Sequence, residues 1–294
     1  MANDWDSLAR ETRLFNRSRA GKLFSAPCRI LGSKLLERRA RALPEGLRRK
    51  VKTFWGAEML VVLPEDVSIS LERYRFFEEE LSSIFLTCLK PGMVVYDIGA
   101  HFGYFSLLAA HLVGTEGRVC SFEPTPSTYS ILTQNTAAAS NMLTVNAAVW
   151  SEARQMKFRD YGLTNAAFNS FDAVTDKMMQ AAAFKEVVVN AITVDDHVAQ
   201  TGLVPAFLKI DAEGAELGIL NGMQKTITSH HPLITVEVGD GASGESTSRA
   251  LLDYAIAHGY EPHEWHDGTI RKHRLLPRYE YDNILLMPRN SASR

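Results

Sequence analysis

Residues 94–103 read VVYDIGAHFG, and this stretch decides the fold. Its apolar run predicts a short buried strand, which passes into a loop that holds Gly99 and Gly103. Helical spacing follows over residues 103–113. A strand, a glycine turn and a helix in this order are typical of an open parallel sheet, where ligands bind at the carboxyl ends of the strands. Both glycines allow the backbone to turn sharply and to approach such a ligand closely.

The same alternation of strand and helix continues along the chain. We expect further core strands at 118–123, 143–145, 206–211 and 233–237, helices at 126–140, 214–223 and 246–258, and last strands near 260–265 and 284–288. Two more strands are expected at 155–159 and 186–192, and upstream a strand at 53–63 and a helix at 70–89. Strands that alternate with helices of this length form right-handed βαβ units, so the sequence predicts an α/β fold.

The composition is that of an ordinary globular chain. Of its 294 residues, 46% are hydrophobic and 22% are charged, which suits one large domain or two small ones. Three scattered cysteines, Cys28, Cys88 and Cys120, form neither a disulfide framework nor a zinc-binding spacing. No apolar run has the length of a membrane helix, and the opening residues do not resemble a secretory signal. We therefore expect a cytoplasmic protein.

A basic segment precedes the rest of the chain. Residues 1–52 hold 14 Lys and Arg against 5 Asp and Glu, a net charge of +9, whereas residues 53–294 carry −11. Apolar residues alternate with these charges at helical spacing: Leu8, Phe15, Phe24, Leu31 and Leu35. We expect a mostly helical extension that either touches the anionic inner face of a membrane or packs as a cap on the acidic body. Nucleic acid is not an expected partner, because no aromatic stacking platform is evident.

Glu123 ends the second predicted strand, twenty residues beyond Gly103 (123 − 103). A carboxylate at this place in a nucleotide-binding fold accepts hydrogen bonds from both ribose hydroxyls. The pyrophosphate fingerprint G-x-G-x-x-G fails in both registers, because His101 or Phe105 occupies its third position. The loop therefore suits an adenosine with an amino-acid tail, whose ammonium group Asp97 could reach directly or through water. An NAD-dependent oxidoreductase is the alternative.

Three stretches carry a family resemblance: 94–106 (VVYDIGAHFGYFS), 121–124 (SFEP) and 208–216 (LKIDAEGAE). They resemble the FkbM family of S-adenosylmethionine-dependent methyltransferases. The resemblance implies a class I, Rossmann-like sheet of seven strands in the order 3-2-1-4-5-7-6, with a reversed last strand. It also implies methyl transfer to an oxygen, typically on a sugar, a glycan or a natural product. We place the methyltransferase domain at 93–290, after a leading strand and helix at 53–92.

The resemblance also assigns residues. Its loop glycines correspond to Gly99 and Gly103, its ribose acid to Glu123, and its fourth-strand acids to Asp211 and Glu213. Together with adjacent residues of the same loops, the predicted cofactor-binding residues are Asp97, Gly99, Ala100, His101, Phe102, Gly103, Glu123, Pro124, Asn146, Ala147 and Asp211. Among these, Asn146 and Ala147 rest on fold analogy alone, as partners of the adenine ring.

A hydroxyl acceptor must lose its proton when it is methylated, so a base or a metal ion is expected beside it. The candidate catalytic residues are Asp211, Glu213, Glu237 and His101. Asp211 and Glu237 end neighbouring strands and could instead hold Mg²⁺ or another divalent ion. Glu213 could equally cap a helix, and His101 could be a loop residue bonded to the backbone. A cofactor-binding module without turnover stays open as a further alternative.

Two other segments have open roles. Residues 162–170 are small and polar, and they either contact the acceptor or form a mobile surface loop. His263, His266 and His273 surround a predicted hairpin, and without matching Cys or Asp residues we interpret them as surface histidines.

Overall fold

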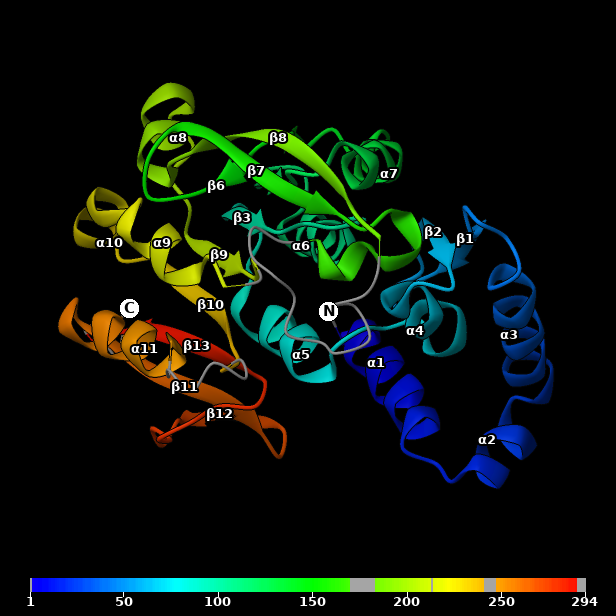
Figure 1. Cartoon of the computed structure of the whole chain (residues 1–294). Coiled ribbons are helices and arrows are strands. Elements are labelled where there is room, and N and C mark those ends of the chain that lie inside the picture. Colours follow the sequence, from blue (N-terminus) through cyan, green and yellow to red (C-terminus); the bar gives the residue numbers. More distant parts are fainter. Residues whose placement is uncertain (1, 170–182, 213, 241–246, 290–294) are drawn as a thin grey trace.

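The computed structural model describes residues 2–169, 183–212, 214–240 and 247–289, and its centre is an eight-stranded sheet with helices on both faces (Figure 1). In spatial order the strands are β12 (Thr269–Lys272), β11 (Tyr260–His266), β13 (Asp282–Pro288), β10 (Leu233–Val238), β9 (Phe207–Ile210), β3 (Val94–Ile98), β4 (Arg118–Phe122) and β5 (Met142–Val145). The five strands from β10 to β5 are mutually parallel. The expected α/β fold is therefore confirmed.

The strand count differs from the expected seven. Seven strands have the neighbours that the order 3-2-1-4-5-7-6 requires, and β13 runs antiparallel to β10 and to β11. The eighth strand is β12, which pairs only with β11 and forms a hairpin at the edge of the sheet. The chain runs from β3 out to β5 and returns to β9 on the other side of β3. Such a reversal of direction opens a crevice at the carboxyl ends of the two strands.

Alternation along the strands sends side chains into two hydrophobic clusters, one on each face of the sheet. Val95 and Phe207 join the first cluster, and Tyr96 and Leu208 join the second. The first cluster packs on α4 (Asp66–Tyr74), α5 (Glu79–Cys88), α6 (Tyr104–Val113) and α7 (Pro126–Thr136). The second packs on α8 (Val194–Thr201), α9 (Glu216–Asn221), α10 (Gln224–His230) and α11 (Thr247–Ala257).

The helix expected over 70–89 is wrong in one respect, because two helices occupy this region. The chain leaves helical geometry between α4 and α5, where Arg75 (φ 63°) and Glu78 (φ 43°) both have left-handed backbone angles. Residues with side chains adopt such angles rarely. The break directs Glu78 away from the helical path.

A small second sheet lies beside the main one. It consists of β6 (Ala148–Val149), β7 (Arg154–Asp160) and β8 (Lys185–Ile192), and the last two match the strands expected at 155–159 and 186–192. The 3₁₀ helix η1 (Leu163–Phe168) follows β7. This helix lies within residues 162–170, the stretch for which the sequence leaves two alternatives, acceptor contact or a mobile surface loop.

The basic N-terminal segment is helical over α1 (Ala2–Phe15), α2 (Arg19–Ser25) and α3 (Pro27–Ala40), as expected. The expectation of helix is wrong for β1 (Leu47–Lys52), which pairs antiparallel with β2 (Glu58–Leu63). Leu8 of α1 is 2% exposed within the first hydrophobic cluster, and Trp5 stacks on Trp265 of β11 at 5.7 Å between ring centroids. The segment is therefore packed on the body of the protein. None of the helices that the structure describes is long and apolar enough to cross a membrane.

Replacing Leu8 tests this packing. We expect Leu8→Ala to lower the free energy of unfolding by about 2–5 kcal/mol, because a buried leucine loses its contacts and leaves a cavity. Leu35→Ala is the matched control: this side chain is 70% exposed, and surface substitutions change stability by about 0.5 kcal/mol or less. Chemical denaturation measures both. Equal, small effects of the two substitutions would contradict the packed position of α1.

Candidate active site

A pocket of about 1080 Å³, part of it open to solvent, lies at the carboxyl ends of the central strands. This is the crevice that the reversal between β3 and β9 predicts. Of the residues expected from the sequence, the pocket is lined by Gly99, Ala100, His101, Glu123, Pro124, Ala147, Asp211 and Glu237. The site thus unites residues from β3, β4, β9 and β10 or from the loops that follow these strands.

Other predicted residues support the pocket without lining it. Phe102 is fully buried, and a side chain at Gly103 would place its Cβ 2.7 Å from Leu132 of α7. The Asn146 amide donates to the carbonyl oxygens of Glu123 (2.8 Å) and Pro124 (3.0 Å) and so holds that loop. Glu213 lies outside the described residues, so its predicted role stays a prediction.

Gly99 is required by a close approach of two loops. Its φ is 76°, and a Cβ atom there would stand 1.8 Å from the backbone oxygen of Asp211. The N–H groups of Gly99 (3.1 Å) and Ala100 (2.9 Å) both donate to the carbonyl oxygen of Phe122. Any larger residue at position 99 would push apart the ends of β3 and β9, where the pocket lies.

Glu123 closes one end of the pocket and is 6% exposed. Its carboxylate accepts the N–H groups of His101 (3.1 Å) and Thr125 (2.9 Å). Burial raises the pKa of this carboxyl to about 7, although these hydrogen bonds favour the ionised form. Since two carboxylate oxygens offer about four acceptor positions, Glu123 retains capacity for further donors.

Lys209 is a charged residue in the middle of a strand that is buried throughout. Its ammonium nitrogen lies 3.4 Å from Asp97 Oδ1, 3.0 Å from Asp211 Oδ2 and 3.3 Å from the Gly99 carbonyl oxygen. Burial lowers the pKa of Lys209, but Asp211 and Asp97 outweigh it and raise the pKa above the ordinary value. Asp97 itself is fully buried and also accepts the Ser106 hydroxyl, so it holds Lys209 rather than lining the pocket.

Asp211 stays ionised beside Lys209. Burial would raise the pKa of Asp211, but Lys209 and a hydrogen bond with Glu237 hold it below its ordinary value. The Asp211 side chain is 29% exposed and lines the pocket, as does Glu237. The two acids that end β9 and β10 therefore meet in one cluster, as expected from their place at neighbouring strand ends.

Glu78 joins this cluster and was not predicted from the sequence. It precedes α5 and lines the pocket, where it accepts the Tyr281 hydroxyl and the Asn283 amide (3.3 Å). Burial, and then the charge of Asp211, raises the pKa of Glu78 well above its ordinary value. Its left-handed backbone angle is a local strain of the kind that accompanies functional positions.

His101 also lines the pocket and supplies an imidazole group, which is a further candidate base. Its φ is 52°, and its ring lies 4.0 Å from that of Phe102 between centroids. Nε2 stands 3.8 Å from Glu65 and has no hydrogen-bond partner among the described residues. Burial lowers the pKa of His101 and so favours the neutral form of the ring. The alternative of a backbone-bonded loop histidine does not match this geometry.

The residues do not fit a divalent ion at the ends of β9 and β10. The cation there is the Lys209 ammonium group, which lies between Asp97 and Asp211. A divalent ion bound to Asp211 would stand close to this fixed positive charge, and the two would repel each other. We therefore derive no step of the chemistry through a metal ion.

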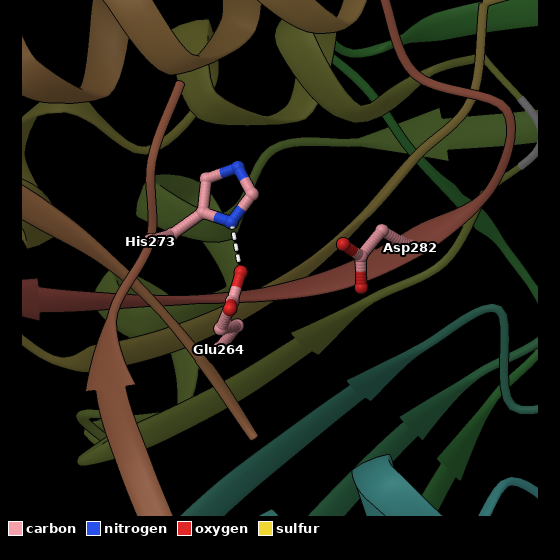
Figure 2. Close-up of side chains that lie close together, drawn as sticks. All are labelled: Glu264, His273 and Asp282. Carbon is pink, nitrogen blue, oxygen red and sulfur yellow. Dashed lines mark hydrogen bonds and ion pairs between the residues drawn. The ribbon is translucent and has the colours of Figure 1, made fainter. Parts of the chain in front are cut away.

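A second group of potential metal ligands, Glu264, His273 and Asp282, lies outside the pocket lining, with its ligand atoms within 4.8 Å of one another (Figure 2). His273 is 6% exposed, so its interpretation as a surface residue is wrong. Its Nδ1 contacts Glu264, and its Nε2 lies 2.9 Å from the Tyr279 hydroxyl. Arg271 also donates to Glu264 (2.7 Å). Because Glu264 already has cationic and hydrogen-bonding partners, we assign the group to support of the β11–β12 hairpin.

The comparisons with known proteins agree with this geometry. Residues 97–262 match the "Methyltransferase FkbM domain" family. The chain is 27% identical over 183 residues to the 31-O-demethyl-FK506 methyltransferase FkbM of Streptomyces tacrolimicus, covering 53% of this chain and 70% of that protein. It is 24% identical over 183 residues to the hexuronic acid methyltransferase AglP of Haloferax volcanii, covering 61% and 70%.

Among solved structures, the methyltransferase FkbM of Methylobacillus flagellatus KT is 16% identical, with a TM-score of 0.44. The match covers 74% of this chain and 52% of that one, so the chain spans about half the length of this solved relative.

The Rossmann-like sheet, the glycine loop and the family match together define a class I, S-adenosylmethionine-dependent methyltransferase. The chain belongs to the FkbM methyltransferase family. This assignment favours methyl transfer over the NAD-dependent alternative.

The raised pKa of Glu123 predicts pH-dependent cofactor binding. Donors on a ribose favour the ionised carboxylate, so the Kd for S-adenosylmethionine should rise as the pH falls below about 7, by up to about tenfold per pH unit. Glu123→Gln should weaken binding by about 1.5–3 kcal/mol for each charge-assisted hydrogen bond that is lost. Calorimetry at pH 6, 7 and 8 measures both effects. The Gln variant serves as the control, and an identical pH profile in both proteins would contradict the assignment.

Proposed function

We propose that this protein transfers a methyl group from S-adenosylmethionine to a hydroxyl oxygen of a sugar, a glycan or a natural product. The observation that carries the proposal is the pocket itself, with Glu123, the predicted ribose acid, at one end and a carboxylate cluster around Lys209 at the other. Two relatives support an oxygen acceptor on a small molecule: one is a 31-O-demethyl-FK506 methyltransferase and the other a hexuronic acid methyltransferase. We also propose a cytoplasmic location.

The bound cofactor would supply a methyl group on a positively charged sulfur, which the acceptor oxygen displaces in line. The residues of this chain must then hold the acceptor and remove the hydroxyl proton. We propose that Glu78 accepts this proton, because its carboxylate lines the pocket and its raised pKa makes it a stronger base than Asp211, whose pKa is lowered. Tyr281 and Asn283 orient this carboxylate toward the pocket.

Asp211 has a different role in this proposal. Its lowered pKa makes it a poor base, but its charge, fixed by Lys209, can orient an acceptor hydroxyl or the cofactor ammonium group. Glu237 shares the hydrogen bond with Asp211 and positions it. His101 is the second candidate base, from the opposite loop, and Glu213 remains a candidate for alignment of the cofactor and acceptor.

The acceptor would enter on the side of η1. Ala166, Ala167 and Asn169 line the pocket there, with Phe158 of β7 and Phe77 before α5. Small and aromatic side chains form a largely apolar wall that fits the carbon skeleton of a sugar ring or a natural product. Of the two roles left open for residues 162–170, we therefore propose acceptor contact.

Substitution of Glu78 separates catalysis from binding. We expect Glu78→Gln to lower kcat by about 10²–10⁴-fold, the contribution typical of a general base, and to leave the Kd for S-adenosylmethionine nearly unchanged. Glu80→Gln is the matched control, since Glu80 is an exposed acid on the first turn of α5. Turnover is followed with radiolabelled S-adenosylmethionine and a panel of sugars, hexuronic acids and natural-product alcohols. Full activity of Glu78→Gln would show that another residue accepts the hydroxyl proton. His101→Asn would then be the next variant to test.

The same assay tests the alternative of a binding module without turnover. If calorimetry shows that the protein binds S-adenosylmethionine, while no fraction of the panel or of a cell extract acquires label, the module is the correct description. Label in a single compound would instead identify the acceptor.

Removal of metal ions provides an independent test of the Lys209 arrangement. We expect EDTA to leave activity unchanged within about twofold, because the Lys209 ammonium group already occupies the cation position between Asp97 and Asp211. Loss of activity in EDTA that added Mg²⁺ or Mn²⁺ restores would show that an ion binds in this cluster.

A further inference from the structure

The N-terminal helices expose large apolar side chains to solvent. Phe24 at the end of α2 is 90% exposed, and Leu35 and Leu31 on α3 are 70% and 57% exposed. With Phe15 and Leu43, five of the ten large apolar side chains that the described residues expose lie within the first 52 positions. Such a concentration on a surface indicates a binding face rather than the scattered exposure of an ordinary monomer.

Helix α3 is apolar on two sides. Its inner side packs on α4 and β2, where Ile30 and Ala40 are buried. Its outer side carries Leu31 and Leu35, which stand one turn apart and therefore project together. Since Leu31 and Leu35 are exposed in the described part of the chain, this outer side is available to a partner.

Basic side chains border the outer side. Lys34, Arg38 and Arg39 are exposed on α3, and within the described part of the chain they form no salt bridge. Other basic residues of the segment, such as Arg29 and Arg49, do form salt bridges, with Glu11 and Glu72. The bordering charges are therefore free to meet an anionic surface, and we call α2 and α3 with these residues the basic–apolar face.

We propose that the basic–apolar face docks on an anionic lipid membrane. Leucine and phenylalanine side chains enter the boundary between headgroups and acyl chains, while lysine and arginine meet the negative headgroups. Figure 1 shows α2 and α3 along one edge of the molecule, away from α10 and α11, so a flat surface can reach them without obstruction by those helices. The helices lie on the membrane in this arrangement and do not cross it.

Two other partners fit less well. A second copy that docked face to face would bring two segments of net charge +9 together, and these would repel each other. A nucleic acid would meet the charges, but leucine offers no stacking partner for a base. Of these three partners, the anionic membrane is the one that satisfies the apolar and the basic residues at once.

Vesicle co-sedimentation of the full chain tests the proposal. We expect binding to phosphatidylcholine vesicles that contain about 30% phosphatidylserine, little binding to pure phosphatidylcholine, and loss of binding in high salt. Phe24→Ser/Leu31→Ser/Leu35→Ser should lower the partition coefficient about tenfold or more, and Lys34→Gln/Arg38→Gln/Arg39→Gln by a similar factor.

The control is Leu143→Ser/Val188→Ser, which removes side chains that are 42% and 63% exposed outside the basic–apolar face and should leave vesicle binding unchanged. Retained binding of S-adenosylmethionine shows that each variant is folded. Three results would overturn the proposal: no binding of the full chain to the anionic vesicles, undiminished binding of either triple variant, or a dimer in light scattering that the apolar variant abolishes. The last result would assign the face to a second copy of the chain.

Discussion

The ion pairs of Lys209 are the constraint on which the rest of the site depends. A single ammonium group, 3% exposed, connects Asp97 at the end of β3 with Asp211 at the end of β9, and it also contacts the Gly99 carbonyl. Removal of one partner from such a buried group leaves an uncompensated charge, which is strongly unfavourable. The two central strands are therefore held in register at the point where the pocket opens, and the turn at Gly99 is fixed between them.

This arrangement also divides the acids of the pocket by function. Lys209 pairs with both Asp97 and Asp211, but one positive charge balances only one of these two carboxylates. Glu78 lies within reach of the negative charge of Asp211. Glu78 gains a proton more readily than it would in water, because burial and then the charge of Asp211 raise its pKa. One cation among several acids thus produces both an ionised residue that orients ligands and a neighbouring residue suited to proton transfer.

Much of the site could be predicted from the sequence because it is encoded locally. The glycine turn and Glu123 each follow a strand directly, and parallel strands bring their carboxyl ends to one edge, so Gly99, Glu123, Asp211 and Glu237 were placed together correctly. Glu78 and Tyr281 could not be found in this way, because 203 positions separate them. Lys209 did leave a signal: a lysine inside a strand that is buried on both faces must have a charged partner. The strand at Leu47–Lys52 was not predicted, because its exposed arginines and lysines match a helical pattern equally well.

The position of β13 has a consequence for biosynthesis. This strand is the last of the sheet to be made, yet it inserts between β10 and β11, and the residues beside its start, Tyr281 and Asn283, hold Glu78. While the ribosome still holds that strand, β10 and β11 must remain unpaired with each other, and Glu78 has no fixed orientation. The nascent chain can complete its glycine turn early, but the carboxylate cluster forms only when the final strand arrives. Premature termination would therefore leave a chain with most of its helices and an exposed sheet edge, the kind of intermediate that chaperones retain.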